Sequence, residues 1–330
     1  MRIAVLGAGA WGTALSINLS ARHQINLWAK SSDHAIEMDS RRINQSFLPG
    51  YALPKSIKIT SILNEALDAV DLALIVVPIS GLRETLRAIV ASNIKVPMLW
   101  GCKGFESITS CLPHQIVEEE CSDLSAHCGV LSGPSFAEEV AQGLPTALTL
   151  AATDADFARK VATELHNSRL RIYTSQDVIG VETGGAVKNV ITIAAGISDG
   201  IGFGHNARAA LITRGLMEIT RLGLGLGGSM STFMGLAGVG DLILTSTGDL
   251  SRNRQVGLML AEGKSLKDIL SELGHVAEGV YTAQSVLQLG NQLNIEMPIT
   301  QAVCSILDES VSARHAVEVL LNREQKTETY

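Results

Sequence analysis

The feature that most constrains the fold of this chain is a glycine-rich turn close to its first residue. An apolar run at residues 3–6 leads directly into Gly7, Gly9 and Gly12, spaced as GxGxxG, and a helical pattern follows at residues 13–21. In such a strand–turn–helix unit the first glycine makes the tight turn, the second lets the backbone approach a ligand, and the third permits close packing of helix on strand. The helix start then offers free N–H groups to the phosphates of a dinucleotide. A ligand-free turn is the alternative, but this context favours a dinucleotide site.

The same architecture extends over the first half of the chain. Short apolar runs alternate with helical stretches, which predicts a parallel sheet; the runs lie at residues 3–6, 25–28, 72–77 and 96–100, with further candidates at 130–132, 147–151 and 171–173. Beyond residue 175 apolar residues recur every three or four positions. Helices are predicted there at residues 178–199, 207–222, 252–262, 265–273 and 282–291.

We therefore predict an α/β protein of two domains. Residues 1–175 form a Rossmann-type doubly wound dinucleotide-binding domain, and residues 176–330 form an all-α domain for substrate binding and catalysis. A length of 330 residues agrees with two domains, because a single core usually stops growing at about 250–300 residues.

Composition narrows the class of protein. A formal net charge of −7 argues against a general nucleic-acid binder, since affinity for phosphate backbones needs clustered Lys and Arg. The strand pattern starts at Arg2 and leaves no room for an export signal, and apolar stretches such as residues 72–77 are too short to span a bilayer, so a cytoplasmic location is expected. No paired CxxC pattern occurs, which predicts reduced thiols and no metal site for five cysteines: Cys102, Cys111, Cys121, Cys128 and Cys304.

Cofactor choice is expected to depend on the end of the second predicted strand. An acidic residue there binds the ribose hydroxyls of NAD, and a basic residue accommodates the 2′-phosphate of NADP. Lys30 and Ser31 follow the strand and favour NADP. Asp33 would serve NAD if the strand ended later, so both dinucleotides stay possible with NADP preferred.

A single cation interrupts an apolar helix in the second half. Lys188 lies in a stretch rich in Gly and Ala, and such small residues let a cofactor or another backbone approach closely. Reducing a carbonyl builds negative charge on its oxygen, so the reaction needs a proton donor and fixed positive charge, and a lysine supplies both. Taken alone, Lys188 could instead extend its amine to the surface.

Two later segments carry polar groups suited to a substrate. Asp241 and Thr245 are four residues apart and share a face if the segment is helical. Ser251 or Asp249 can cap the following helix, and that helix start, reinforced by Arg252 and Asn253, would bind an anion such as phosphate. An ordinary capped surface helix is the alternative.

These residues together resemble the bacterial-type NAD(P)-dependent glycerol-3-phosphate dehydrogenases over nearly the whole chain. The matching motifs occur in the family's order at residues 7–12, 47–49, 103–104, 131–135, 185–189, 238–241, 251–253, 278–279 and 297–299. Two departures occur: Ala10 replaces a common Ser, and Cys102 replaces a usual Thr or Ser. Neither affects the residues expected to carry the phosphate or the proton.

The resemblance implies a role for each matching residue. Lys188 is the proton donor and acceptor, Lys103 contacts substrate and cofactor, and Asp241 orients Lys188 and keeps it charged. The implied substrate contacts are Lys103, Gly133, Ser135, Lys188, Asp241, Ser251, Arg252 and Asn253. The implied cofactor contacts are Gly7, Gly9, Ala10, Trp11, Gly12, Lys103, Ala137, Arg252, Val276 and Glu278, in addition to Lys30 and Ser31, which are expected from their position after the second strand. Asn189 and Thr245 are expected to connect this network.

The resemblance also implies the reaction, which is hydride transfer between a nicotinamide dinucleotide and the C2 carbon of dihydroxyacetone phosphate, giving sn-glycerol 3-phosphate for phospholipid synthesis. A homodimer is expected. One alternative is a reductase of 3-hydroxy acids or ketopantoate, but such enzymes typically carry an asparagine one turn after the lysine, where this chain has Ile191 and Thr192. A dinucleotide sensor without catalysis is another, although it would not need Lys103, Lys188, Asp241 and Arg252 together.

Overall fold

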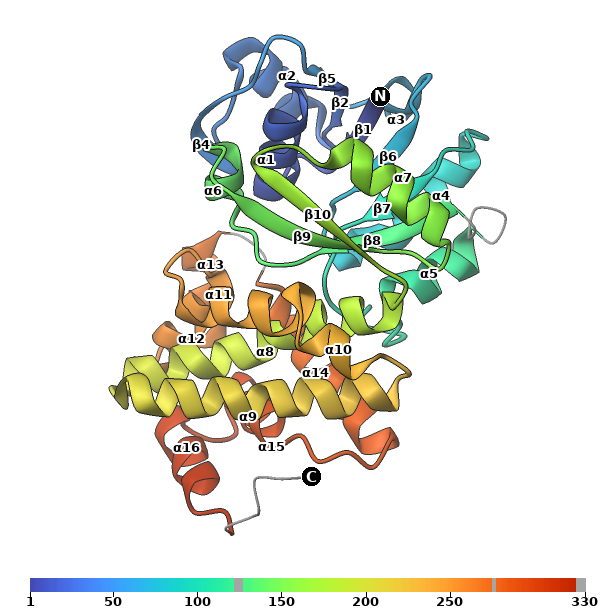
Figure 1. The fold of residues 1–330 in the computed structure, drawn as a ribbon. Helices are drawn as coiled ribbons and strands as arrows, with labels where there is room; N and C mark the ends of the chain where they lie inside the picture. The colour runs from blue at the N-terminus through green and yellow to red at the C-terminus, as the bar shows by residue number, and fades with distance from the viewer. Residues whose placement is uncertain (122–126, 275–276, 325–330) are drawn as a thin grey trace.

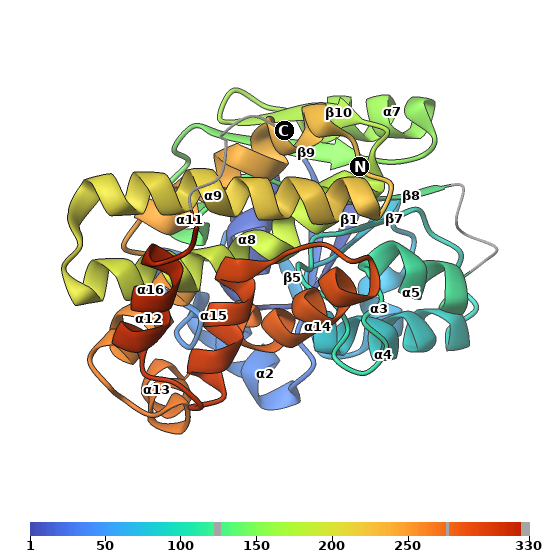
Figure 2. The ribbon, with the colours of Figure 1, turned by 90° about the horizontal axis from the view of Figure 1, so that it is seen from below.

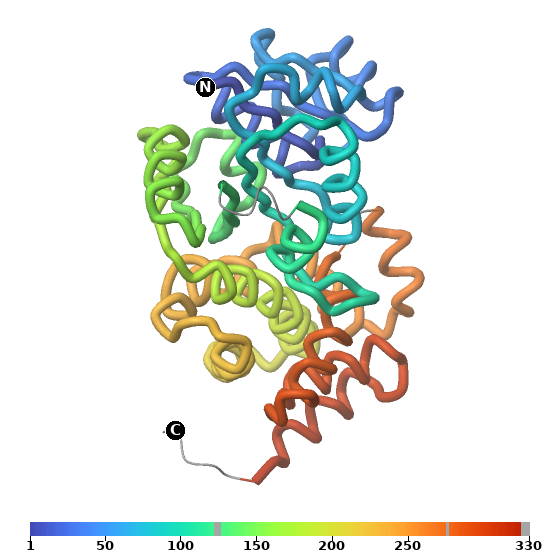
Figure 3. The backbone as a smooth tube through the Cα atoms, turned by 90° about the vertical axis from the view of Figure 1, so that its right-hand side faces the viewer, coloured from blue at the N-terminus to red at the C-terminus, as the bar shows by residue number. Residues whose placement is uncertain are grey.

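The computed structural model describes residues 1–121, 127–274 and 277–324. A large sheet with flanking helices forms the upper half of the molecule in Figure 1, and a group of helices forms the lower half. Figure 3 shows the same two parts from the side, with the chain from blue to green above and from yellow to red below. The predicted α/β architecture is confirmed.

Within the described part of the chain, the main sheet has eight strands in the order β10-β9-β8-β7-β6-β1-β2-β5, and only β8 and β9 pair antiparallel. The strands are β1 (Arg2–Leu6), β2 (Gln24–Trp28), β5 (Lys58–Thr60), β6 (Leu72–Ile75), β7 (Met98–Trp100), β8 (Cys128–Ser132), β9 (Thr146–Ala151) and β10 (Leu170–Ser175). From β5 to β8 this is the doubly wound arrangement, in which the chain reverses direction across the sheet at β1. Ligands of such sheets bind at the carboxyl ends of the strands beside that reversal.

Helices cover both faces of the sheet because the strands are apolar on both sides. Along β1, Ile3 and Val5 join one core, and Ala4 and Leu6 join another. The first core is closed by α1 (Ala10–Leu19), α6 (Ala137–Ala141) and α7 (Ala155–Leu165). The second is closed by α3 (Leu63–Leu67), α4 (Ile79–Ala91) and α5 (Pro113–Glu120).

All seven strands predicted from the sequence are present, with bounds that shift by one or two residues. The pattern missed β5 and the small antiparallel pair β3 (Ile43–Asn44) and β4 (Leu48–Ala52). Runs of two or three residues are too short to show a period. Between β2 and β5, helix α2 (Ser32–Arg41) starts with Ser31 as its N-cap.

The second half consists of helices and connecting loops, with no strand among its described residues. It contains α8 (Val178–Ile201), α9 (Gly204–Gly225), α10 (Met230–Phe233), a π-helical turn (Leu236–Gly240), α11 (Asp241–Thr247), α12 (Arg252–Ala261), α13 (Leu266–Leu273), α14 (Glu278–Gln292), α15 (Pro298–Leu307) and α16 (Ala313–Leu321). The five predicted helices are confirmed. Seen from below, α14, α15 and α16 follow one another beside α8 and α9 (Figure 2).

Helix α8 is the centre of this half. It is long and apolar enough to cross a membrane, but 89% of its most apolar window is buried inside the protein, as in the core helix of a globular domain. Asp177 caps its start, and Gly202 ends it with a φ of 88°. Because β10 ends at Ser175 and α8 starts at Val178, we propose residues 1–175 and 176–330 as the two domains.

Candidate active site

The glycine-rich turn joins β1 to α1 at the carboxyl edge of the sheet. Gly7 has a φ of 123°, and a Cβ on Gly12 would lie 2.0 Å from the Gly7 carbonyl oxygen, so both positions need glycine. A Cβ on Gly9 would meet no atom within 4 Å, which leaves the outer side of the turn open. Gly9 is also the N-cap of α1 and provides no side-chain cap, so the first N–H groups of the helix remain available to phosphates.

Asn44 supports this turn from the β3–β4 pair. Its Nδ2 donates to the Ala8 carbonyl at 2.9 Å and to Thr13 Oγ1 at 2.7 Å, and its side chain is fully buried. Sequence reasoning did not select Asn44, because it lies thirty residues beyond the motif in a strand too short to predict.

Trp11 extends from the turn toward the end of β7, which is the second strand from β1 in the sheet. A Cβ on Gly101 would lie 2.2 Å from Trp11 Cζ3, so the indole packs directly on the backbone that follows β7. The Trp11 Nε1 atom is buried and has no partner among the described residues. An unpaired donor beside open phosphate-binding N–H groups fits a dinucleotide.

Lys30 and Ser31 lie at the carboxyl end of β2, as expected. Lys30 Nζ pairs with Glu84 Oε2 at 2.7 Å, and both side chains are largely exposed. Exposed ion pairs contribute little, so Lys30 can release Glu84 for another anion. The Ser31 hydroxyl accepts a hydrogen bond from the His34 N–H as the cap of α2.

Three charged side chains meet where β7, α8 and α11 converge. Lys188 Nζ donates to Asp241 Oδ1 at 2.8 Å, and Lys103 Nζ donates to Asp241 Oδ2 at 2.6 Å. The Lys103 amine also lies 3.4 Å from the Gly133 carbonyl oxygen at the end of β8. Lys188 is only 4% exposed, so the alternative of a lysine that extends to the surface is wrong.

The electrostatics of this group suit proton transfer. Burial lowers the pKa of Lys188 to about 8, although Asp241 opposes the change. Burial alone would raise the pKa of Asp241, but Lys103 and Lys188 outweigh it and hold that pKa below its usual value. Asp241 is therefore a carboxylate shared by two amines, and Lys188 gains or loses its proton near neutral pH.

Small residues let these elements approach. A Cβ on Gly185 would lie 3.0 Å from Ser132 Oγ and 3.5 Å from Lys103 Cγ, and a Cβ on Gly184 would lie 2.7 Å from the Ala237 carbonyl oxygen. The Gly-rich π-helical turn then leads into α11, whose first residue is Asp241. Sequence analysis anticipated close approach along α8 but not its partners.

The start of α12 lies against the same part of α8. Ser251 caps this helix, since its hydroxyl accepts from the Arg254 N–H at 3.3 Å, whereas Asp249 pairs with the Arg254 guanidinium. Asn253 Nδ2 donates to Asn189 Oδ1 at 3.0 Å, and Asn253 Oδ1 accepts from the Gly279 N–H at 3.1 Å. The expected link through Asn189 therefore joins α8, α12 and α14.

Arg252 is exposed at this helix start and makes no ion pair with the residues that the structure describes. Glu278 begins α14, and burial raises its pKa against the influence of Arg252, Lys103 and Lys188. The three cations thus lie within electrostatic range of one carboxylate. The Thr245 hydroxyl forms hydrogen bonds nearby, with Thr192 Oγ1 at 3.0 Å and with the Asp241 carbonyl oxygen at 2.7 Å.

The remaining expected contacts surround the end of β8. Gly133 has a φ of 135°, and Ser135 Oγ donates to its carbonyl oxygen at 3.3 Å. Ala137 is the first residue of α6. Ala10 is likewise the first residue of α1. Val276 lies outside the described residues.

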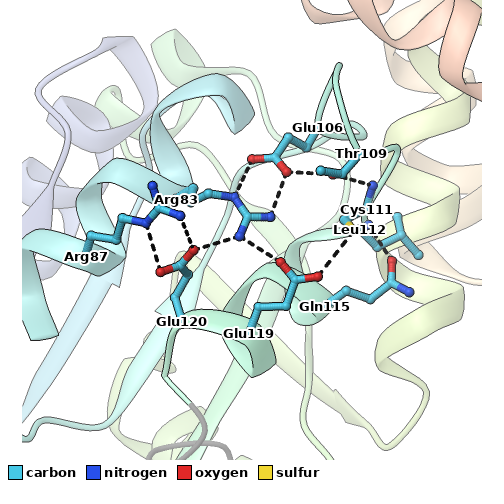
Figure 4. A network of polar contacts seen from close by, with 9 residues as sticks. All are labelled: Arg83, Arg87, Glu106, Thr109, Cys111, Leu112, Gln115, Glu119 and Glu120. Atoms are coloured by element: carbon cyan, nitrogen blue, oxygen red, sulfur yellow. Dashed lines mark hydrogen bonds and ion pairs between the residues drawn. The ribbon is translucent and has the colours of Figure 1, made fainter.

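Arg83 on α4 anchors the segment that carries Lys103, and sequence reasoning missed it. Its guanidinium donates two hydrogen bonds to Glu106, at 2.8 and 2.7 Å, and reaches Glu119 and Glu120 on α5 at 2.7 Å each. Figure 4 shows Arg83 between these three carboxylates. Little in the sequence indicated this cluster, because the three carboxylates lie far from Arg83 along the chain and among many other charged residues.

Comparison with known sequences assigns both halves of the chain to one family. The profile of the NAD-dependent glycerol-3-phosphate dehydrogenase N-terminus matches residues 2–158, and that of the C-terminus matches residues 177–318. A protein of Nitrosospira multiformis named glycerol-3-phosphate dehydrogenase, NAD(P)+, is 65% identical, and one of Nitrosomonas eutropha with the same name is 60% identical. Each match covers 100% of both chains.

Solved structures agree. The crystal structure of glycerol-3-phosphate dehydrogenase from Coxiella burnetii superposes with a TM-score of 0.92 at 42% identity, covering 98% of this chain and 99% of that one. A ketopantoate reductase from Ralstonia eutropha gives a TM-score of 0.61 at 16% identity, covering 96% of this chain and 100% of that one, and shares the fold alone.

Proposed function

Because this chain belongs to the NAD-dependent glycerol-3-phosphate dehydrogenase family, we propose that it interconverts dihydroxyacetone phosphate and sn-glycerol 3-phosphate with NAD(P). The observation that carries this proposal is the row Lys103–Asp241–Lys188 at the carboxyl edge of the sheet. It lies next to Gly101, on which Trp11 of the dinucleotide turn packs. A buried proton donor therefore lies close to the predicted cofactor site.

Lys188 is the proton donor in this proposal. As the C2 carbonyl is reduced its oxygen becomes an alkoxide, and the Lys188 ammonium transfers one proton to it. In the reverse direction the neutral amine takes the hydroxyl proton. Asp241 orients the amine by its 2.8 Å bond, and Lys103 adds positive charge that favours the oxyanion.

The substrate phosphate is assigned to the start of α12. Ser251, Arg252 and Asn253 lie at the start of that helix, and Arg252 has an exposed guanidinium suited to a phosphate. The Asn253–Asn189 bond connects this position to the residue beside Lys188.

The glycine turn, with Gly7, Gly9 and Gly12, is assigned to the pyrophosphate of the dinucleotide. The open side of Gly9, the uncapped α1 and the unpaired Trp11 Nε1 support this assignment. A bound nicotinamide dinucleotide supplies and accepts the hydride. Lys30 and Ser31, which follow β2, favour NADP, and Ala10, Ala137 and Glu278 are assigned as further cofactor contacts.

We also propose a homodimer, a cytoplasmic location and a role in supplying glycerol phosphate to phospholipid synthesis. These assignments rest on the family resemblance. The homodimer is testable on the purified protein, as described in the Discussion.

A steady-state assay with dihydroxyacetone phosphate, run in parallel with NADPH and NADH, tests the reaction. We expect turnover with both dinucleotides, and an at least 100-fold lower kcat for Lys188→Ala, because general acid catalysis typically contributes 10²–10⁴-fold. Normal turnover by a folded Lys188→Ala protein would contradict the proposal.

A matched pair of arginines tests the phosphate assignment. Arg252→Ala should lower kcat/KM for the triose phosphate about 100-fold with little change in Tm. Arg254 lies two residues later but pairs with Asp199 at 2.7 Å, so Arg254→Ala should lower Tm instead. Equal kinetic effects of both substitutions would argue against phosphate binding by Arg252.

A further inference from the structure

Helix α8 contacts the segment that carries Lys103 at three levels, each three residues further along the helix. Glu182 contacts the residues that flank the segment, Gly185 packs on the Lys103 stem, and Lys188 meets the Lys103 amine through Asp241. Residues three apart lie above one another on a helix, so these contacts form one row. Gly185 allows close packing and Lys188 is the proposed proton donor, whereas neither role explains Glu182.

Glu182 binds both ends of this segment, which connects β7 to α5. Its Oε1 accepts from Trp100 Nε1 at 2.6 Å and from the His114 backbone N–H at 2.9 Å, and its Oε2 pairs with His114 Nδ1 at 2.5 Å. Trp100 is the last residue of β7, and His114 is the second residue of α5. One side chain therefore fixes where the segment begins and where it ends.

Stability alone does not explain a carboxylate at this position. Glu182 is 4% exposed, and burial raises its pKa, which shows that the charged form is costly there. Buried ionic groups can often be replaced by apolar residues without loss of stability, and what they provide in some proteins is a fixed geometry. The geometry fixed here is that of residues 101–112.

We propose that Glu182 is a positioning residue, which holds Trp100 and His114 so that the intervening segment keeps the Lys103 amine on Asp241, opposite Lys188. This inference deepens the proposed function and rests on it. Arg83 binds Glu106 of the same segment (Figure 4). That contact does not involve Glu182, so we expect a Glu182 substitution to leave Glu106 in place and to release the part of the segment that carries Lys103.

The arrangement has a consequence for the proton donor. The positive charge of Lys103 lowers the pKa of Lys188, and Lys103 shares the carboxylate that raises it. If Lys103 moves away, Asp241 pairs with Lys188 alone, and the pKa of Lys188 rises. Among the described residues, Glu278 on α14 is the further titratable group that faces Lys188. Cys102 faces Glu182, and Glu118 faces His114.

The test compares four variants. Glu182→Ala removes all three contacts, and Trp100→Phe removes one hydrogen bond. Glu182→Gln keeps the oxygen that accepts from Trp100 Nε1 and the His114 N–H, and replaces the oxygen that pairs with His114 Nδ1 by an NH2 group. Asp177→Ala is the control, because this carboxylate caps the start of α8 and accepts hydrogen bonds from the Gly180 and Ser229 N–H groups at 2.8 Å, and among the described residues it makes no bond to the Lys103 segment. For each protein, kcat for dihydroxyacetone phosphate reduction is measured against pH, and NADPH affinity is measured by fluorescence titration.

We expect Glu182→Ala to lower kcat at least tenfold, with NADPH affinity changed less than threefold. The pH at which kcat declines should rise by about one unit, because a displaced cation no longer opposes protonation of Lys188. Trp100→Phe should shift both quantities in the same direction by less, and Glu182→Gln should retain most of the activity. Asp177→Ala should lower the melting temperature without moving the pH profile.

The inference is overturned if Glu182→Ala and Trp100→Phe leave kcat and the pH profile unchanged. It is also overturned if both variants lower kcat by the same factor as Asp177→Ala and the pH profile does not shift. If Glu182→Ala does not fold, Trp100→Phe and His114→Ala decide on the same two readouts. Wild-type turnover is measured first, so failure of the proposed function is seen in the wild type, whereas failure of this inference is seen in the variants.

Discussion

A buried amine at the centre of the site gives the enzyme a defined pH dependence. Reduction needs the protonated form of Lys188, whose pKa is lowered to about 8 by burial. In reduction, kcat should therefore be level below about pH 7 and decline as pH rises through 8. In oxidation of glycerol 3-phosphate the neutral amine is needed, so kcat should rise over the same interval. Measurement in both directions between pH 6 and 10 checks this.

Asp241→Asn tests whether the titration of Lys188 causes the decline of the reductive kcat at high pH. The carboxylate raises the pKa of Lys188, so its removal should move the decline of the reductive rate to lower pH. The two amines would also lose their common partner, and kcat should fall about 100-fold. A decline that stays near pH 8 in Asp241→Asn would show that another group titrates there.

Lys30 offers a residue-scale test of cofactor choice. Its partner Glu84 is on the surface, so Lys30→Ala should leave the melting temperature nearly unchanged. We expect KM for NADPH to rise about tenfold, because a charge-assisted bond to the 2′-phosphate is lost, while KM for NADH stays the same. Equal effects on both dinucleotides would assign the 2′-phosphate to other residues.

At the scale of elements, Gly196 in α8 and Gly257 in α12 let the two helices pack backbone to backbone. A Cβ on Gly257 would lie 2.1 Å from the Ile193 carbonyl oxygen, so Gly257→Ala must push the helices apart. We expect a loss of about 2–3 kcal/mol in the free energy of unfolding and a higher KM for the triose phosphate, since α12 carries Arg252. Denaturant unfolding and steady-state kinetics measure both effects.

Gly81 in α4 is the matched control. A Cβ there would meet only Val77 side-chain atoms at 3.7 Å, an ordinary contact. Gly81→Ala should therefore be neutral or stabilise by up to about 1 kcal/mol. Similar losses at both positions would mean that the helix contact is not the reason for Gly257.

The Arg83 cluster connects α4, the Lys103 segment and α5. Arg83→Met should lower Tm at pH 7 by about 3–6 °C, whereas Arg87→Met, whose side chain is mostly exposed, should have a smaller effect. Hydrogen bonds from Arg83 hold the pKa of Glu106 below its usual value. The stabilisation is thus present above the unfolded-state pKa and is lost as pH falls through the folded-state pKa.

Thermal unfolding of wild type and Arg83→Met at several pH values tests whether this stabilisation is lost at low pH. The difference in Tm between the two proteins should shrink as pH is lowered below about 4. A difference that grows in acid would contradict an ionised Glu106.

At the scale of the whole molecule, the expected homodimer can be measured directly. Sedimentation equilibrium should give twice the mass of one chain at micromolar concentration. If the chain sediments as a monomer and the monomer retains full turnover, assembly is not needed for the site. This outcome would leave the assignments of Lys188 and Arg252 intact, because both come from a single chain.

Much of the candidate site could be predicted from the sequence. The glycine turn, Lys188, Asp241 and the start of α12 were identified from motifs, because each motif is a short run whose spacing carries its own local geometry. The strand and helix patterns determined the α/β order for the same reason, since a period is visible wherever an element spans several residues. Very short elements such as β3 and β5 were missed.

Only the tertiary structure decided which residues meet. It placed Asp241 between two lysines that come from 138 and 53 residues away, and it brought Glu182 onto Trp100 and His114. It also decided that the start of α12 is capped by Ser251 rather than Asp249. Such pairings depend on how whole helices and strands pack, and a single sequence records spacing along the chain but not proximity across the core.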